Sequence, residues 1–230
     1  MLDLNKYLKV VVTVDNVIFG FDEAELKVLL IKRTEDPYEN QWALPGYFIS
    51  DNEDLVDAAK RVLAETTGIE NVYLEQVGSF GAPMRHPSGR VVTVAYYSII
   101  NIKDFKLQAS SIAEKAEWAS LQRISNLAFD HEEICKKAFK LLKNKIKIEP
   151  IGFGLLPPKF SLTSLQILYE SILEIKLDKR NFRKKILKKN ILIELEESQK
   201  DVPHRPAKLY SFNRKNYEKL LASGYSLDIL

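Results

Sequence analysis

Residues 45–69 contain charged side chains whose spacing is compatible with magnesium and phosphate chemistry. Arg61 and Glu65 are four residues apart, so on a helix they share one face, with Val62 and Thr66 as the neighbouring pair. Mg²⁺ often takes only one or two protein carboxylates when substrate phosphates supply its other ligands. Magnesium-assisted phosphate chemistry around Glu65 is therefore one hypothesis for this stretch.

The elements that position these residues are a turn and a helix. Pro45 and Gly46 form a tight turn, a helix is expected to begin near Asp54, and Gly68 is typical of a helix end. An ordinary amphipathic surface helix over residues 54–67 fits the apolar positions. It does not account for the turn, the charged residues and the glycine together.

This stretch resembles the box of Nudix hydrolases, which is Gly, five residues, Glu, seven residues, then Arg-Glu-apolar-x-Glu-Glu-x-Gly-apolar. Tyr47 stands at the first Gly, and Val62 and Thr66 stand at two of three metal-binding Glu positions. The resemblance implies a structural ion pair between Glu53 and Arg61. It also implies no catalytic residue, no metal and no cofactor, because the family's chemistry needs converging carboxylates around Mg²⁺. The positions that match are Glu53, Arg61, Leu63, Glu65, Gly68 and Ile69.

A second segment, residues 81–97, resembles the Arg-Asp-Pro loop of Nudix proteins that act on ADP-ribose and of their regulator relatives, with His86 in place of the Asp. Arginines present planar forks of donors that suit phosphate or sugar oxygens. The alternatives are a solvated hairpin for this loop and a purely structural Trp42. The predicted ligand-binding residues are Trp42, Tyr47, Arg85 and Arg90.

Composition indicates a globular protein without a membrane segment. Of 230 residues, 46% are hydrophobic and 28% charged, and no apolar run is long enough to cross a bilayer. The N-terminus lacks a signal pattern, so we expect a cytoplasmic protein. Cys135 is the single cysteine, which excludes an internal disulfide, and three scattered histidines argue against a histidine metal site.

Hydrophobic patterns predict strands at residues 8–19, 26–32, 73–80 and 91–102, and a helix at 130–146 that begins at Asp130. The connections are too short for repeated crossover helices. We therefore expect an α+β fold, and the Nudix resemblance implies an α/β/α sandwich with a mixed sheet.

The Pro- and Gly-rich residues 148–160 suggest a linker between a domain at 1–147 and another at 161–230. Charge supports two domains. Residues 151–230 hold 15 Lys and Arg against 9 Asp and Glu, a net charge of +6, whereas residues 1–150 carry −3. The second domain is therefore expected to bind an anionic partner.

The order of helices and strands in the second domain predicts a winged helix. A first helix is capped by Ser161 or Thr163, and a second helix capped by Asp178 precedes strands at 191–195 and 207–212. The expected core positions are Leu165, Leu168, Tyr169 and Ile172 on the first helix and Phe182, Ile186 and Leu187 on the second.

The outer face of the second helix is basic and would enter the major groove, with the loop between the strands as the wing. A charge run is also compatible with a merely solvated helix face. The predicted DNA-binding residues are Lys179, Arg180, Asn181, Arg183, Lys184, Lys188, His204, Arg205 and Lys208.

Taken over nearly its full length, the chain resembles the Nudix-related transcriptional regulators (NrtR-like), notably at residues 60–82, 94–99, 149–157 and 178–187. The resemblance implies a homodimeric regulator that binds double-stranded operator DNA and senses ADP-ribose or a pentose such as L-arabinose. Two alternatives stay open: a Mg²⁺-dependent hydrolase of ADP-ribose or nucleotide sugars, and a hydrolase with a C-terminal RNA-binding module.

Overall fold

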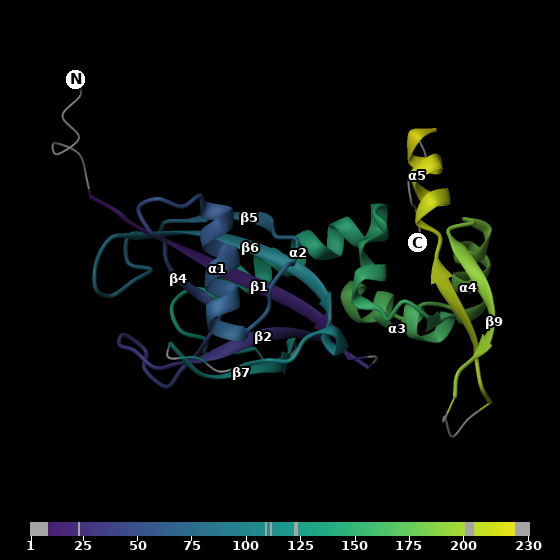
Figure 1. Ribbon diagram of the computed structural model, residues 1–230, viewed down its shortest axis with the longest axis horizontal. Helices are drawn as coiled ribbons and strands as arrows, with labels where there is room; N and C mark the ends of the chain where they lie inside the picture. Colours follow the sequence, from purple (N-terminus) through teal and green to yellow (C-terminus); the bar gives the residue numbers. More distant parts are fainter. Residues whose placement is uncertain are drawn as a thin grey trace. The chain divides into compact units, whose positions relative to one another are not determined.

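The computed structural model describes residues 9–22, 24–108, 110, 112–121, 124–200 and 205–223, and within them the chain forms two compact units (Figure 1). The first unit comprises the described parts of Met1–Phe19, Lys27–Ser98 and Phe105–Phe139. The second comprises those of Gly20–Leu26, Ile99–Asp104 and Lys140–Leu230.

The first unit is built on a mixed seven-stranded sheet whose main path is β3-β2-β1-β6-β5, with β4 paired to β1 and β7 paired to β2. Strands β1, β2, β5 and β6 follow the predicted apolar runs. The sequence did not predict β3, β4 and β7, because the first two are very short and the third is rich in charge. The strands are β1 (Val11–Phe21), β2 (Leu26–Arg33), β3 (Trp42–Ala43), β4 (Gly46–Phe48), β5 (Glu75–Phe80), β6 (Val91–Asn101) and β7 (Ala113–Ser120).

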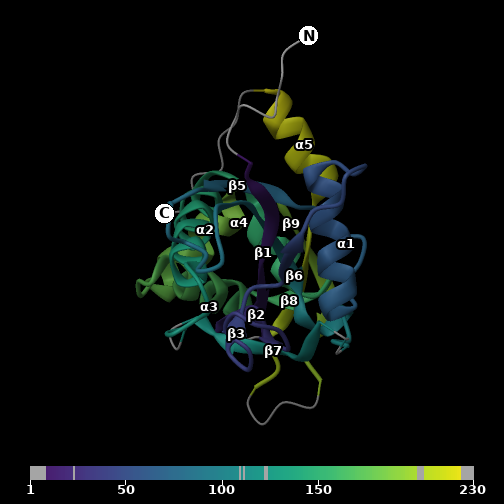
Figure 2. The same ribbon diagram turned by 90° about the vertical axis from the view of Figure 1, so that its left-hand side faces the viewer.

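Helices lie on both sides of this sheet. Figure 2 shows α1 (Leu55–Thr67) on one side and α2 (His131–Ile148) on the other. Asp54 is the N-cap of α1, and Gly68 ends it in the left-handed conformation at φ 75°, as predicted. A short 3₁₀ turn, η2 (Ile102–Asp104), follows β6. The α+β class and the mixed sheet are therefore confirmed.

The second unit has the predicted order of a winged helix. Its three-stranded sheet runs β8-β10-β9. The sequence did not predict β8 or the final helix. The elements are η4 (Pro150–Leu155), β8 (Phe160–Ser161), α3 (Leu162–Leu173), α4 (Lys179–Lys188), β9 (Leu192–Ser198), β10 (Lys208–Phe212) and α5 (Arg214–Ala222).

Side-chain caps fix the starts of α3 and α4. The Ser161 hydroxyl accepts a hydrogen bond from the Ser164 amide at 3.0 Å, and the Asp178 carboxylate accepts one from the Asn181 amide at 2.8 Å. The four predicted core positions of α3 are fully buried. On α4, Phe182 and Ile186 are buried, but the prediction for Leu187 is wrong because its side chain is 42% exposed.

The segment predicted as a linker folds within the second unit. It contains η4, where Phe153 and Leu155 are buried, and the Phe153 ring stacks on Phe212 with 4.5 Å between centroids. The segment is therefore a packed part of the winged helix and not an exposed connector. The domain boundaries at 147 and 161 stay a prediction. None of the helices that the structure describes has the length and apolar character that crossing a bilayer requires.

Candidate functional site

The box residues form an ion-pair cluster that ties the middle of α1 to the preceding loop. Arg61 donates two hydrogen bonds to the Glu53 carboxylate, at 2.9 and 2.6 Å, and a third to the Phe48 carbonyl at 3.0 Å. The Ser50 amide donates to Glu53 as well, at 2.6 Å. Hydrogen bonds from Arg61 and then Ser50 lower the pKa of Glu53 to about 2. The expected ion pair is thus present.

The same helix does not offer a cradle for a divalent ion. Val62 and Thr66 are fully buried, and the Thr66 hydroxyl donates to the Val62 carbonyl at 2.7 Å. The remaining carboxylate, Glu65, accepts a hydrogen bond from Arg61 at 2.9 Å. Within the described ranges, no group of three or more His, Cys, Asp or Glu side chains is placed to hold a metal ion. At the three metal-binding positions of the box, this helix therefore offers one carboxylate, that of Glu65, which is paired with Arg61.

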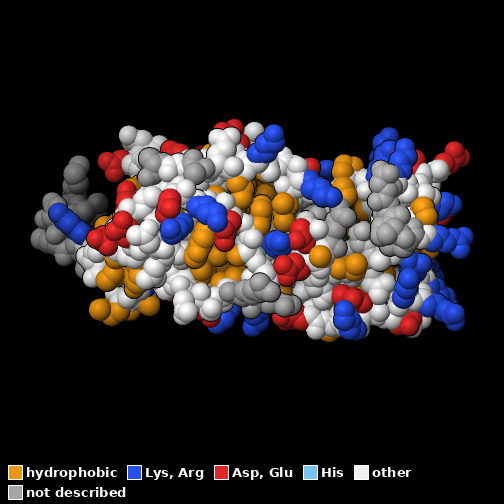
Figure 3. Space-filling model, turned by 90° about the horizontal axis from the view of Figure 1, so that it is seen from below, with side chains coloured by type: hydrophobic (Ala, Val, Ile, Leu, Met, Phe, Trp, Pro, Cys, Tyr) orange, Lys and Arg blue, Asp and Glu red, His pale blue; other side chains and the backbone are white. Residues whose placement is uncertain are grey.

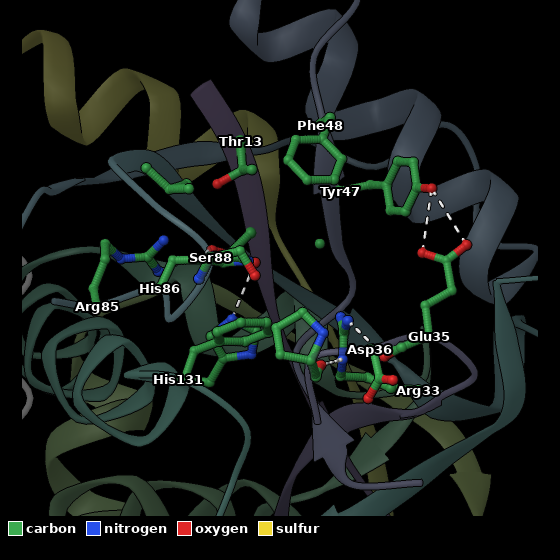
Figure 4. A pocket seen from close by; sticks show the side chains of 15 residues that line it. Thr13, Arg33, Glu35, Asp36, Tyr47, Phe48, Arg85, His86, Ser88 and His131 are labelled. Atoms are coloured by element: carbon green, nitrogen blue, oxygen red, sulfur yellow. Dashed lines mark hydrogen bonds and ion pairs between the residues drawn. The ribbon is translucent and has the colours of Figure 1, made fainter. Parts of the chain in front are cut away.

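A cavity of about 230 Å³ lies beside β4, the strand that precedes this box (Figure 4). Its lining comes from β1, β4, the loop after β2, the loop before β6 and the start of α2. Its charged or titratable lining residues are Asp15, Arg33, Glu35, Asp36, Arg85, His86 and His131, and its aromatic ones include Tyr47, Phe48 and Phe129.

Three buried side chains, Asp15, Arg85 and His131, form the innermost part of the lining, which we call the floor. Arg85 donates to both carboxylate oxygens of Asp130, at 2.9 and 2.5 Å, and lies 3.7 Å from Asp15. The Leu44 amide donates to Nδ1 of His131 at 3.0 Å, so the ring proton sits on Nε2, which is 3.4 Å from Asp15 Oδ1. Burial lowers the pKa of His131, which favours the neutral ring.

Gly46 lets the Asp15 carboxylate occupy the floor. The two residues pair across β1 and β4, and a Cβ at position 46 would lie 1.9 Å from Asp15 Oδ1. No side chain fits in that space. The glycine predicted as a turn residue thus also provides a close approach.

Phe129 forms an aromatic wall of the cavity. The His86 ring stacks on it at 5.0 Å with an angle of 16°, and the Arg33 guanidinium lies 4.9 Å from its centroid. Arg33 also donates to the backbone carbonyls of Pro37 at 3.1 Å and Glu35 at 3.0 Å, which fixes the loop after β2. Burial lowers the pKa of Arg33 and that of His86.

Two of the four predicted ligand-binding residues line this cavity. Tyr47 does so with its hydroxyl 3.4 Å from the Glu35 carboxylate, and Arg85 reaches it from the loop before β6 (Figure 4). Trp42 lies in β3 opposite Lys32 and is not among the lining residues. Arg90 is not either; its guanidinium donates to the Gly81 carbonyl. The ligand-binding roles of Trp42 and Arg90 stay predictions.

Sequence reasoning did not single out Asp15, Arg33, Phe129 or His131 as site residues. One signal was available, because Asp15 and Asn16 interrupt an otherwise apolar strand. Asn16 is structural: its side-chain amide donates to the Pro45 and Ala59 carbonyls, at 3.3 and 3.0 Å.

Asp130, where the helix at 130–146 was predicted to begin, directly precedes α2. Its carboxylate accepts hydrogen bonds from Arg85, and only its backbone carbonyl joins the helix, by accepting from the Ile134 amide at 3.1 Å. The Asp130 side chain is thus hydrogen-bonded to a residue that is distant in the sequence.

The second unit carries the predicted basic surface on α4. Lys179, Arg180, Asn181, Lys184 and Lys188 are exposed there. In Figure 3, Lys and Arg side chains gather on the second unit.

The remaining predicted DNA-binding residues differ in their surroundings. Arg183 is half-buried and donates to the Thr163 hydroxyl at 3.1 Å, and Lys208 pairs with Glu194 across the wing strands. Arg205 is exposed in the wing. His204 lies outside the described residues.

Comparison with known proteins gives two family matches in series. Residues 9–142 match the NUDIX domain, and residues 152–212 match the NrtR DNA-binding winged helix domain. The ADPR responsive transcriptional repressor NtrR of Acinetobacter baylyi is 40% identical over 216 residues, which is 92% of this chain and 86% of that protein.

Solved structures agree with this division. NrtR of Shewanella oneidensis in complex with a 27mer DNA matches with a TM-score of 0.74 and 31% identity, over 87% of this chain and 93% of that one. The NUDIX domain of the same protein in complex with ADP ribose matches with a TM-score of 0.57 and 32% identity, over 61% of this chain and 94% of that one.

Proposed function

Because the chain belongs to the Nudix-related transcriptional regulators, we propose that it is a DNA-binding repressor that responds to ADP-ribose bound in its Nudix domain. The observation that carries this proposal is the 40% identity to an ADPR responsive repressor across both units. The cavity beside the box and the basic face of α4 are the corresponding sites for effector and DNA.

On the DNA side, α4 enters the major groove and the β9–β10 loop forms the wing. The exposed lysines of α4 neutralise phosphates, which makes affinity dependent on salt. Arg180 and Asn181, near the start of the helix, have the bidentate donor and acceptor geometry that base edges require. We further propose a homodimer, whose two α4 helices meet half-sites about 34 to 36 Å apart on a palindromic operator.

Effector control follows from two conformations with different DNA affinity. ADP-ribose that binds better to the form with mismatched α4 spacing shifts the population toward it and releases DNA. No hydrolysis is needed for this. We propose that the box is catalytically degenerate, since Val62 and Thr66 are buried in the positions where the hydrolases have metal-binding carboxylates.

A free pentose such as L-arabinose is a second candidate effector. The observation that favours it is the set of carboxylates in the cavity, because sugar hydroxyls donate hydrogen bonds to such groups. A cavity of about 230 Å³ also suits a small ligand.

The experiment starts from the purified full chain and a random duplex DNA library, from which bound sequences are selected. Binding to the selected duplex is then titrated with ADP-ribose, with L-arabinose and without effector. We expect nanomolar to micromolar binding that ADP-ribose weakens at least tenfold. The proposal is contradicted if neither compound changes the affinity of the protein for DNA.

A parallel assay addresses the hydrolase alternative. ADP-ribose and Mg²⁺ are incubated with the protein, and AMP release is followed by chromatography. We expect no turnover above the background rate. Rapid AMP release without duplex binding at moderate salt would establish the hydrolase instead.

A further inference from the structure

We infer that the cavity holds one ribose ring of the effector, with its vicinal hydroxyls directed at Asp15, while the diphosphate lies outside the cavity. This inference rests on the proposed function, because it states which part of ADP-ribose the cavity takes. It is carried by the size of the cavity, the charges of its lining and the bonding of Asp15.

The cavity is too small for the whole effector. Pockets that enclose a drug-sized ligand measure roughly 300 to 1,000 Å³. ADP-ribose is a ligand of that size, with a base, two riboses and a diphosphate. A cavity of about 230 Å³ therefore takes a part of ADP-ribose and not the whole molecule.

The charges of the lining disfavour the diphosphate. Three carboxylates, those of Asp15, Glu35 and Asp36, face two guanidinium groups. Arg85 already has both Asp130 oxygens as partners, and Arg33 is engaged by two backbone carbonyls and the Phe129 ring. A diphosphate placed among these carboxylates would meet like charges without a free cation to offset them.

Asp15 provides the acceptor that a diol needs. Its side chain is only 6% exposed, and no hydrogen bond from the described residues reaches its carboxylate. The nearest donors, Nη2 of Arg85 at 3.7 Å and Nε2 of His131 at 3.4 Å, are beyond the usual hydrogen-bond range of 2.7–3.2 Å. A nearly buried carboxylate that lines a cavity with unused acceptor capacity suits a ligand with two adjacent hydroxyl donors.

The walls fit the rest of a sugar ring. Tyr47, Phe48 and Phe129 supply apolar surface on the lining, which matches the C–H faces of ribose. The Thr13 and Ser88 hydroxyls add neutral polar contacts. The lining thus combines carboxylate acceptors, hydroxyls and aromatic rings, a set that suits a neutral polyol better than a polyanion.

The test uses matched ligands that differ by one hydroxyl. Binding of ADP-ribose, of its 2′-deoxy form, which lacks a hydroxyl on the adenosine ribose, and of its 2″-deoxy form, which lacks one on the terminal ribose, is measured by calorimetry. A site that bonds a hydroxyl rejects the analogue that lacks it. We expect at least a tenfold loss for one of the two deoxy forms, which also identifies the ribose in the cavity.

The Asp15→Asn variant locates the hydroxyl. The deoxy penalty is the loss of affinity caused by removing the hydroxyl from ADP-ribose. In Asp15→Asn this penalty should fall below threefold, because the acceptor charge is gone. In Asp57→Asn, on the exposed face of α1, the full penalty should remain. Equal binding of all three ligands, or an unchanged penalty in Asp15→Asn, overturns the inference. If Asp15→Asn does not melt cooperatively, binding of the two deoxy ligands to the natural protein decides the inference.

Failure of the proposed function gives a different result. In that case the natural protein binds no ADP-ribose, or binds it without any change in DNA affinity. Failure of the ribose assignment leaves both of those properties intact and removes only the discrimination between the hydroxyl and deoxy forms.

Discussion

Arg85 and Asp130 form a two-hydrogen-bond ion pair, at 2.9 and 2.5 Å, between the loop before β6 and the residue that precedes α2. The Arg85 side chain is 3% exposed, so removal of its main partner leaves a buried charge without adequate compensation.

We therefore expect Asp130→Ala to lower the free energy of unfolding of the first unit by about 3 kcal/mol. Chemical denaturation followed by circular dichroism measures this loss. The control is Glu132→Ala, which removes an exposed pair with Lys136 and should cost less than about 1 kcal/mol. Equal losses in the two variants would contradict a buried role for the Arg85 pair.

The Glu53–Arg61 pair predicts a loss of stability in acid. The pKa of Glu53 is about 2 in the folded protein, against an ordinary value of 4.5. Because the unfolded chain takes up the proton first, the contribution of this group is complete above pH 4.5 and is lost as the pH falls toward 2. Melting temperatures from pH 6 to pH 2.5 should therefore decline less steeply for Glu53→Gln than for the natural protein. Parallel curves for the two proteins would show that protonation of Glu53 does not lower stability between pH 6 and pH 2.5.

His131 predicts a second loss of folding stability, at a higher pH than that of Glu53. Burial holds its pKa below the ordinary 6.5, with Arg85 and Arg33 acting in the same direction and Asp15 and Asp130 against it. The unfolded chain binds the proton first, so stability is full above pH 6.5 and falls as the pH drops below that value. In His131→Gln, the slope of melting temperature between pH 6.5 and 5 should decrease.

A comparison variant for this slope is His86→Gln. The pKa of His86 is lowered as well, but its ring is only half-buried, so its effect on the slope should be smaller. A larger effect at His86 than at His131 would refute the assignment of this decline to the floor of the cavity.

The exposed face of α4 predicts two kinds of DNA-binding defect. Lys184→Ala should reduce the slope of log affinity against log salt by about 1, similarly for all sequences. Asn181→Ala should instead cost about 1 to 3 kcal/mol on the selected duplex and little on random DNA. Fluorescence anisotropy over a salt series separates the two. Lys136→Ala, an exposed lysine of the first unit, is the control and should change neither quantity.

The long elements of this fold were predictable because their residues carry periodic patterns and local end signals. Ser161 and Asp178 mark helix starts through side-chain hydrogen bonds to amides three residues on, and Gly68 marks a helix end by its left-handed conformation; Asp54 is at the N-cap without a side-chain hydrogen bond. Leu187 was misplaced because it follows Ile186 directly and so lies about 100° round the helix from that residue; its side chain is 42% exposed, whereas Phe182 and Ile186 are buried.

The cavity was less predictable, because its contacts join residues that are far apart in the chain. Arg85 and Asp130 are separated by 45 positions, and Leu44 and His131 by 87. Local pattern therefore placed Asp130 at a helix start but could not show that its side chain binds an arginine. The family pattern pointed to Arg85 and Arg90 alike; Arg85 lines the cavity, whereas Arg90 donates to the Gly81 carbonyl of its own loop.

The missing side chain at Gly46 limits how this protein can be re-engineered for a different effector. Even alanine would have to displace the Asp15 carboxylate, so main-chain atoms form that part of the lining and cannot be tuned by substitution. The neighbouring Tyr47 and Phe48 face the same space with large rings. Designers who seek altered selectivity should begin with those two rings and leave the glycine untouched.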